Sequence, residues 1–330
     1  MRHFKNTYQQ CFGSMVLEAI ARLSAGFLNL RNLTLDFPSI SPSFNSHALR
    51  SFFDSLWATL ENRLYCLSLT GGLLGYRTIL QNPPILSSLK QLEIQIVNNP
   101  QDLSGGLDVD ALFDNFACFI NRQSQSLDAL KIWSCPSRSQ AVDLSHFFAQ
   151  LSSFPSLSSL DVRLAFNKSF YDPSGLKYLI WNTSGTLKRL NLRLNPSGFA
   201  MPWDMEPQLC PWLSTCLANP QAFSRLQVLD IYPSREPENV FILMECIRRA
   251  SINLEEIIIR DHYLQWDEAA AIINEASQCK KLVSLHLNVW EIDINLIDLL
   301  SKKLPGIENL SLSTVESQVE DFPVSEFSFF

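Results

Sequence analysis

Residues 187–195 read LKRLNLRLN. Leu187, Leu190 and Leu192 are spaced three and then two residues apart, and Asn195 follows at the ninth place. Alternation of apolar and polar residues is typical of a β-strand with one buried face. We therefore expect the last two leucines to point into a core. One copy of so short a pattern is weak evidence for a strand. The prediction therefore depends on whether the pattern recurs along the chain.

The same spacing of large aliphatic residues occurs ten times along the chain. The ten copies begin at Leu30, Leu64, Leu89, Leu127, Leu157, Leu187, Leu226, Leu254, Leu282 and Ile307. Successive copies start 25 to 39 residues apart, about 31 on average. A pattern that returns at such a period indicates a repeat architecture, in which each unit buries its apolar face against its neighbours.

Between the copies, apolar residues recur with helical spacing. The amphipathic segments are 47–63, 108–122, 237–250, 267–278 and 294–303, with shorter ones near 143–151, 174–182 and 207–218. A helix is about 10 Å wide, whereas neighbouring strands are about 4.8 Å apart, so stacked strand–helix units must curve. We predict an α/β fold: a curved right-handed solenoid (horseshoe) of about ten repeats, with parallel strands on the concave face and helices on the convex face.

The chain is expected to form a single domain over residues 1–330, because no linker, low-complexity tract or charge block divides it. Residues 30–315 would form the repeats. Residues 11–27 have the pattern of an amphipathic helix, so 1–29 are predicted to be the helical half of a repeat that lacks its own strand and to act as a cap. Residues 316–330 are predicted to be a tail that folds back as a C-terminal cap.

Composition excludes several classes of partner. The chain is 46% hydrophobic, and its formal net charge of −7 gives no general attraction to nucleic acid or to an anionic membrane. Its apolar runs are far shorter than the roughly 18 residues of a membrane span, and the N-terminus lacks the apolar region of a secretory signal. We therefore expect no nucleic-acid partner and no membrane partner.

The eight cysteines include no C-x-x-C pair. Five fall in or beside helical segments, and two fall on or just after strands. They are predicted to be buried free thiols: Cys118, Cys210, Cys216, Cys246 and Cys279 in the first group, Cys66 and Cys135 in the second. Disulfide frameworks belong to short secreted chains with little core. A cytoplasmic and/or nuclear location is therefore expected.

Two rows of strand side chains are expected to face the concave side. The middle of the first row, just after the last core position, is Trp133, Arg163, Arg193, Tyr232 and Arg260. The second row, between the core positions, includes Lys131, Asp161 and Asp230. Trp, Tyr and Arg are enriched in protein-binding hot spots. We predict that these eight residues bind a protein or peptide ligand, and that the arginines favour an acidic or phosphorylated segment. Alternatively, the charged residues form lateral salt bridges and bind nothing.

Two long intervals between copies provide a second candidate, because loops at the ends of strands often bind ligands. They contain residues 97–110 and 196–211. Trp203 lies in the second of these and either contacts a ligand or fills the interior of its own loop.

Catalytic motifs are absent from the sequence. There is no G-x-S-x-G, no H-E-x-x-H and no phosphate-binding glycine loop. The histidines at 146, 262 and 286 have no acidic partner at a fixed spacing and look solitary. We therefore predict no enzyme activity, no cofactor and no metal site.

The phrase L-x-x-L-x-L-x-x-N/C with a helix in each repeat resembles leucine-rich repeats of the ribonuclease-inhibitor type. Asn195 and Cys135 occupy its ninth place, and the other copies carry different residues there. The irregular, Phe- and Trp-rich style of residues 14–315 resembles the repeat regions of F-box leucine-rich-repeat proteins, especially those common in fungi.

This resemblance implies the substrate-recognition region of a ubiquitin-ligase receptor, with cullin–RING ligase subunits as partners if an F-box is encoded upstream. No F-box is found in the 29 residues before the first predicted strand, so we expect a fragment, a shortened gene model or a descendant of an F-box parent. The alternative is a stand-alone scaffold or inhibitor unrelated to ubiquitin.

Overall fold

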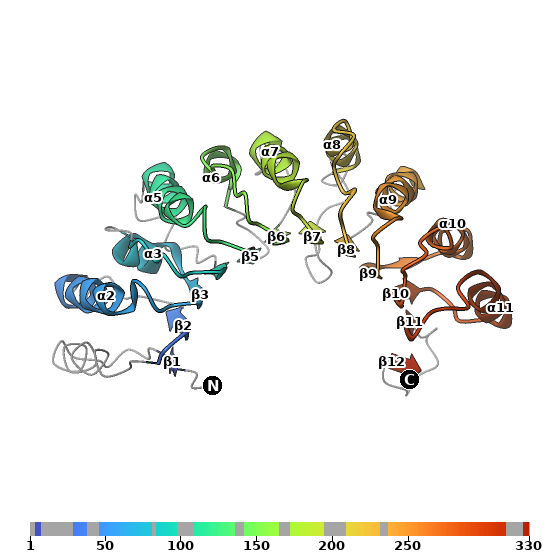
Figure 1. The fold of residues 1–330 in the computed structure, drawn as a ribbon, viewed down its shortest axis with the longest axis horizontal. Helices are drawn as coiled ribbons and strands as arrows, with labels where there is room; N and C mark the ends of the chain where they lie inside the picture. Colours follow the sequence, from blue (N-terminus) through green and yellow to red (C-terminus); the bar gives the residue numbers. More distant parts are fainter. Residues whose placement is uncertain are drawn as a thin grey trace. The chain divides into compact units, whose positions relative to one another are not determined.

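The computed structural model describes most of the chain and shows strands that alternate with helices, an α/β arrangement (Figure 1). The described residues are 4–7, 29–37, 46–80, 84–97, 108–135, 142–164, 172–194, 209–231, 237–314 and 326–329. They belong to two compact units. Unit 1 comprises Met1–Leu157 and Lys168–Asn182, and unit 2 comprises Ser158–Asn167 and Thr183–Phe330.

In the described part of unit 1, parallel strands lie side by side in chain order. They are β1 (Phe4–Thr7), β2 (Asn32–Phe37), β3 (Cys66–Gly71), β4 (Gln91–Val97) and β5 (Ala129–Cys135). The helices are α2 (Ser46–Leu60), α3 (Leu73–Ile79), α5 (Val109–Arg122), α6 (Ser145–Ala149) and all but the last residue of α7 (Ser174–Thr183). The helices lie on one side of the strands (Figure 1).

Unit 2 repeats this arrangement, again with the helices on one side of the strands (Figure 1). Its described strands are β6 (Ser159–Leu164), β7 (Arg189–Leu194), β8 (Val228–Ile231), β9 (Glu256–Leu264), β10 (Ser284–Val289), β11 (Asn309–Thr314) and β12 (Glu326–Phe329). Its helices are α8 (Leu209–Cys216), α9 (Pro237–Ala250), α10 (Trp266–Ala276) and α11 (Ile294–Lys303). Strands β6 to β11 are parallel, and β12 runs antiparallel to β11.

The buried face of each sheet comes from the last two aliphatic positions of the repeated pattern. In β2 and β3, for example, Leu33 pairs with Leu67 and Leu35 pairs with Leu69, and all four are buried. The residues between them are half-exposed, as the period of two requires. The ten strands expected from the pattern are all present as β2 to β11, so this prediction is confirmed.

The first leucine of the pattern precedes a backbone junction, which we call the entry joint. Here the carbonyl of the next residue accepts two backbone N–H groups from the corresponding place in the following copy, at 2.7–3.0 Å. The accepting residues are Arg31, Tyr65, Lys90, Ser158, Lys188, Gln227, Glu255 and Val283. Because one carbonyl has two lone pairs, each entry joint fixes the first residue of the following strand and the residue before it with a single acceptor.

Close packing supports the helix side of unit 1. A Cβ atom on Gly175, in α7, would lie 2.4 Å from the backbone nitrogen of Ala149 at the end of α6. Only glycine allows this approach, because backbone cannot move aside as a flexible side chain can.

Tyr76 of α3 is fully buried, and its hydroxyl oxygen lies 2.7 Å from the Leu69 carbonyl and 2.9 Å from the Gln95 carbonyl. Burial raises the pKa of Tyr76 well above its usual value.

The ends of the chain differ from the expectation in one respect. The prediction that the N-terminal half-repeat lacks a strand is wrong, because β1 pairs with β2, with Phe4 beside Leu33 and Asn6 beside Leu35. The strand escaped detection because Asn6 stands where the pattern requires an aliphatic residue. The helix predicted at 11–27 lies outside the described residues. At the other end, the tail returns to the sheet as β12, with Phe329 beside Leu310.

Two further local predictions need correction. The sequence did not indicate α3, whose segment LLGYRTI has only seven residues and carries an apolar residue, Leu74, on its more exposed side. Among the described free cysteines, Cys216, Cys246 and Cys279 are buried, whereas Cys66 in β3 is half-buried and Cys118 on α5 is exposed. Burial raises the pKa of Cys246 to about 12 and that of Cys279 to about 11. Among the residues that the structure describes, no helix is both long and apolar enough to cross a membrane.

Candidate protein-binding face

In each unit, the candidate binding residues that the structure describes lie on the strand side that faces away from the helices, which we call the strand face. Their positions follow from the strand register, because the aliphatic residues on either side of each are buried and the candidates alternate with them. The structure describes seven of the nine candidates. Tyr232 and Trp203 lie outside the described residues, as do residues 196–208 of the second insertion.

In unit 1, the candidates Lys131 and Trp133 of β5 form one cluster with Glu93 of β4. Lys131 lies directly opposite Glu93 on the neighbouring strand, and its Nζ atom is 3.0 Å from the carboxylate oxygen. The same ammonium group lies 3.5 Å from the centroid of the Trp133 ring. The side chains of Lys131 and Glu93 are 28% and 31% exposed. We call this group the lysine cluster.

In unit 2, strands β6 to β9 carry the other five described candidates, which with Asn191 form the charged strand face. Asp161 pairs with Asn191, and Asn191 pairs with Asp230 on the next strand. The Asn191 side-chain amide donates to Asp161 Oδ2 at 3.2 Å. This row is therefore linked laterally by side chains as well as by backbone.

Arg163 and Arg193 occupy directly opposed positions on β6 and β7. Both side chains are half-exposed. Like charges directly across neighbouring strands repel each other, so this pair favours the presence of a negative group nearby. Asp161 and Asp230 supply negative charge from the adjacent row. The three arginines of the charged strand face exceed its two aspartates by one, although the whole chain is acidic.

Asp230 departs from the expected surface position. Its side chain is only 4% exposed, and it forms an ion pair with Arg260, whose side chain is 38% exposed. Burial raises the pKa of Asp230, whereas the Arg260 guanidinium and the more distant Arg193 oppose that rise. Within the described part of the chain, Asp230 Oδ1 and Arg260 Nε are buried and have no hydrogen-bond partner. At this position, the geometry matches the lateral salt bridge weighed as the alternative to binding.

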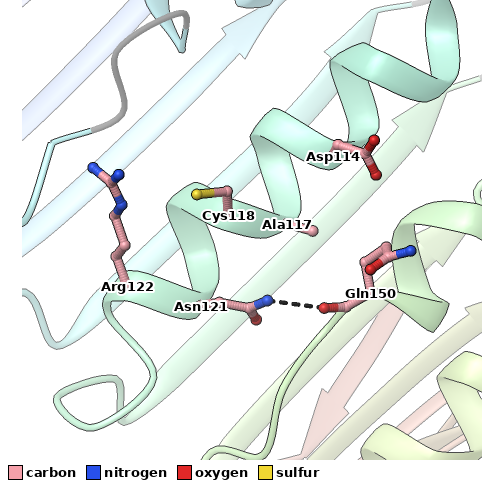
Figure 2. Close-up of a pocket in the computed structure, with 6 residues that line it drawn as sticks. All are labelled: Asp114, Ala117, Cys118, Asn121, Arg122 and Gln150. Carbon is pink, nitrogen blue, oxygen red and sulfur yellow. Dashed lines mark hydrogen bonds between the residues drawn. The ribbon is translucent and has the colours of Figure 1, made fainter.

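A different surface feature lies on the helix side of unit 1, between α5 and α6. It is an open depression of about 690 Å³ lined by Asp114, Ala117, Cys118, Asn121, Arg122 and Gln150 (Figure 2). The Asn121 side chain reaches across it and donates to the Gln150 carbonyl at 2.8 Å, while its oxygen accepts from the Ser152 backbone at 2.8 Å. These bonds tie α5 to the turn after α6, which gives the depression a structural role.

Two of the histidines that look solitary in sequence have acidic neighbours in space. His146 Nε2 lies 2.7 Å from Asp114, and His262 Nε2 lies 3.7 Å from Glu268. The Asp114 contact was missed because the two residues come from successive copies of the repeat, 32 positions apart. Among the described residues, no group of three or more His, Cys, Asp or Glu side chains could hold a metal ion.

Comparison with known proteins adds no family assignment. No protein-family model matches the chain, and no curated protein matches it.

Proposed function

We propose that the chain is a leucine-rich-repeat solenoid of about ten repeats that binds a protein or peptide on a concave strand face. The parallel strands, their alternation with helices and the entry joints support the solenoid, because each copy is completed by the next. The proposed role is non-catalytic: the strand face presents side chains to a partner and performs no reaction on it.

One observation carries the binding proposal: Arg163 and Arg193 lie side by side on neighbouring strands. An acidic or phosphorylated segment would accept hydrogen bonds from both guanidinium groups and remove their mutual repulsion. Trp133 of the lysine cluster adds an aromatic anchor of the type enriched in protein interfaces. Arg260 contributes less to binding, because it already forms an ion pair with Asp230.

For the biological setting, we propose the substrate-recognition region of an F-box-type ubiquitin-ligase receptor. Its support is the resemblance of the irregular repeats to those of F-box leucine-rich-repeat proteins. A stand-alone scaffold or inhibitor uses the same surface without any ubiquitin-ligase subunit. The two hypotheses differ in which proteins accompany the chain, and this difference can be measured.

The decisive experiment is affinity capture with the tagged full-length protein, followed by mass spectrometry. We expect one main partner, together with cullin–RING ligase subunits if an F-box is encoded upstream. Trp133→Ala combined with Arg193→Ala should abolish capture of that partner and leave the thermal midpoint nearly unchanged, because both side chains are half-exposed. The matched control is Arg225→Ala, which removes an exposed arginine from the turn after α8.

The binding proposal and the ubiquitin-ligase proposal are contradicted by different results. Unchanged capture by the double variant, with a lowered thermal midpoint, would assign the two residues a purely structural role. Capture of the main partner without any ligase subunit would favour the stand-alone scaffold.

A further inference from the structure

Two neighbouring segments of unit 2 form a surface distinct from the strand face. Residues 261–268 (DHYLQWDE) span the end of β9 and the start of α10, and residues 290–298 (WEIDINLID) follow β10 and begin α11. We call them together the acidic aromatic rim. The segments are adjacent, because Leu264 pairs with Val289 and the Trp290 backbone N–H donates to the Leu264 carbonyl at 3.0 Å.

Large apolar side chains are exposed on this rim. Trp266 is 47% exposed, Trp290 is 50% exposed and Ile294 is 78% exposed. The Trp290 ring also lies near the Tyr263 ring, with the centroids 6.3 Å apart. The first residues of α10 and α11 are thus both large and apolar, and these two helices pack against each other. Single exposed apolar residues are common, but several gathered at one edge mark an interaction surface.

Charge on the rim has one sign. The two segments contain no Lys or Arg and carry Asp267, Glu268, Glu291, Asp293 and Asp298. Part of this charge has a structural purpose. Asp293 accepts from the Leu296 backbone at 2.7 Å, Glu268 accepts from the Gln265 backbone at 2.7 Å, and Asp298 pairs with Lys302. Asp267 and Glu291 are exposed and provide acidic groups beside the two tryptophans.

These features define the chemistry of a partner. An exposed indole attracts a guanidinium or ammonium group over its face, and neighbouring carboxylates strengthen that attraction. The same carboxylates repel nucleic acid and anionic lipid. We propose that the acidic aromatic rim docks a basic segment of a partner protein, rich in Arg or Lys and carrying at least one large apolar side chain. This proposal is independent of the charged strand face, where three arginines accompany two aspartates.

The test uses a library of random dodecapeptides displayed on phage and selected against the full-length protein. The strongest basic sequence is then synthesised with a fluorescent label, and its affinity is measured by fluorescence anisotropy. We expect peptides of net positive charge with an aromatic or long aliphatic residue. Their affinity should fall as salt rises, because part of the attraction is between charges that salt screens.

Variants locate the site. Trp266→Ala combined with Trp290→Ala should lower the affinity for the labelled peptide at least about tenfold, the size expected for losing interface hot spots. Asp267→Lys with Glu291→Lys should also abolish binding, and the milder Asp267→Asn with Glu291→Gln should weaken it. The matched control is Phe241→Ala, which removes an exposed aromatic residue from α9.

Three outcomes would overturn the proposal. One is a selection that yields no basic peptide. Another is a basic peptide that binds the tryptophan variant as tightly as the parent while circular dichroism shows both folded. The third is an equal loss of affinity in the Phe241→Ala control. Acidic peptides whose binding is lost on Arg193→Ala would be bound by the strand face instead. The result for one site therefore does not decide the result for the other.

Discussion

The lysine cluster of unit 1 and the Asp230–Arg260 pair of unit 2 place the same kind of interaction in different surroundings. Both join charged residues on neighbouring strands of a sheet. Glu93 and Lys131 are directly opposed and about equally exposed, whereas Asp230 is almost fully buried and Arg260 is not. Arg260 also lies two residues beyond Ile258, the residue opposite Asp230, so this pair is diagonal.

The comparison shows that the position of a charge in the repeat does not determine its energetic role. A half-exposed pair gains little, because water solvates either ion nearly as well as the partner does. A buried carboxylate has lost its water and depends on the partner that remains. One sheet pattern therefore produces an adaptable surface in unit 1 and a structural constraint in unit 2.

The largest expected effect follows from removing the partner of the buried carboxylate. Arg260→Ala should lower the free energy of unfolding by about 2–3 kcal/mol at neutral pH, less than for a fully buried pair because the guanidinium is partly in water. Asp230→Ala should cost less, because it leaves the half-exposed arginine free to be solvated. Urea denaturation of the three proteins measures both changes, and a reversed order would contradict the assignment of Asp230 as the dependent partner.

A smaller effect should appear in the pH dependence of stability. Burial raises the pKa of Asp230 above the ordinary value of 3.8. The folded protein therefore keeps the proton at pH values where the unfolded chain has released it. The free energy of unfolding should then fall as pH rises from 3.8 through the raised value. Urea midpoints of the parent and of Asp230→Asn, measured across this range, should converge at its acidic end, and parallel profiles would refute the buried-carboxylate account.

The smallest effect is expected in the lysine cluster. Lys131→Ala should lower the free energy of unfolding by about 1 kcal/mol, the sum of a weak ion pair and a contact with the Trp133 ring. Glu93→Gln should cost about 0.5 kcal/mol and lose that cost in high salt. Thermal denaturation at two salt concentrations measures both. A loss as large as that of Arg260→Ala would erase the distinction between the two regions.

Much of the fold could be predicted because the apolar positions of the repeated pattern are the positions that are buried. Leu190 and Leu192 alternate with polar residues in the sequence and alternate in burial in the structure. The same reasoning failed at β1, where Asn6 occupies an aliphatic position, and at α3, where most residues are buried. In β1 one residue breaks the alternation, and in α3 two turns are too short for the contrast between its buried and exposed sides to stand out in sequence.

The candidate site was only partly predictable for a different reason. Strand register follows from the pattern, so the alignment of Arg163 with Arg193 could be expected. The burial of Asp230 and the contact of His146 with Asp114 depend on side chains from other copies, which no local spacing records. The pattern therefore predicts which residues share a row but not how exposed to solvent each side chain is.

The entry joints have a consequence for how such a chain tolerates change. They use main-chain atoms alone, so any side chain except proline at the two donating positions leaves the junction intact. The spacing between successive leucines varies from 25 to 39 residues, whereas the joint has the same form at each of the eight places. Each such copy is thus anchored at its entry joint and free to differ in length between joints, so insertions and deletions between two joints should leave both joints intact.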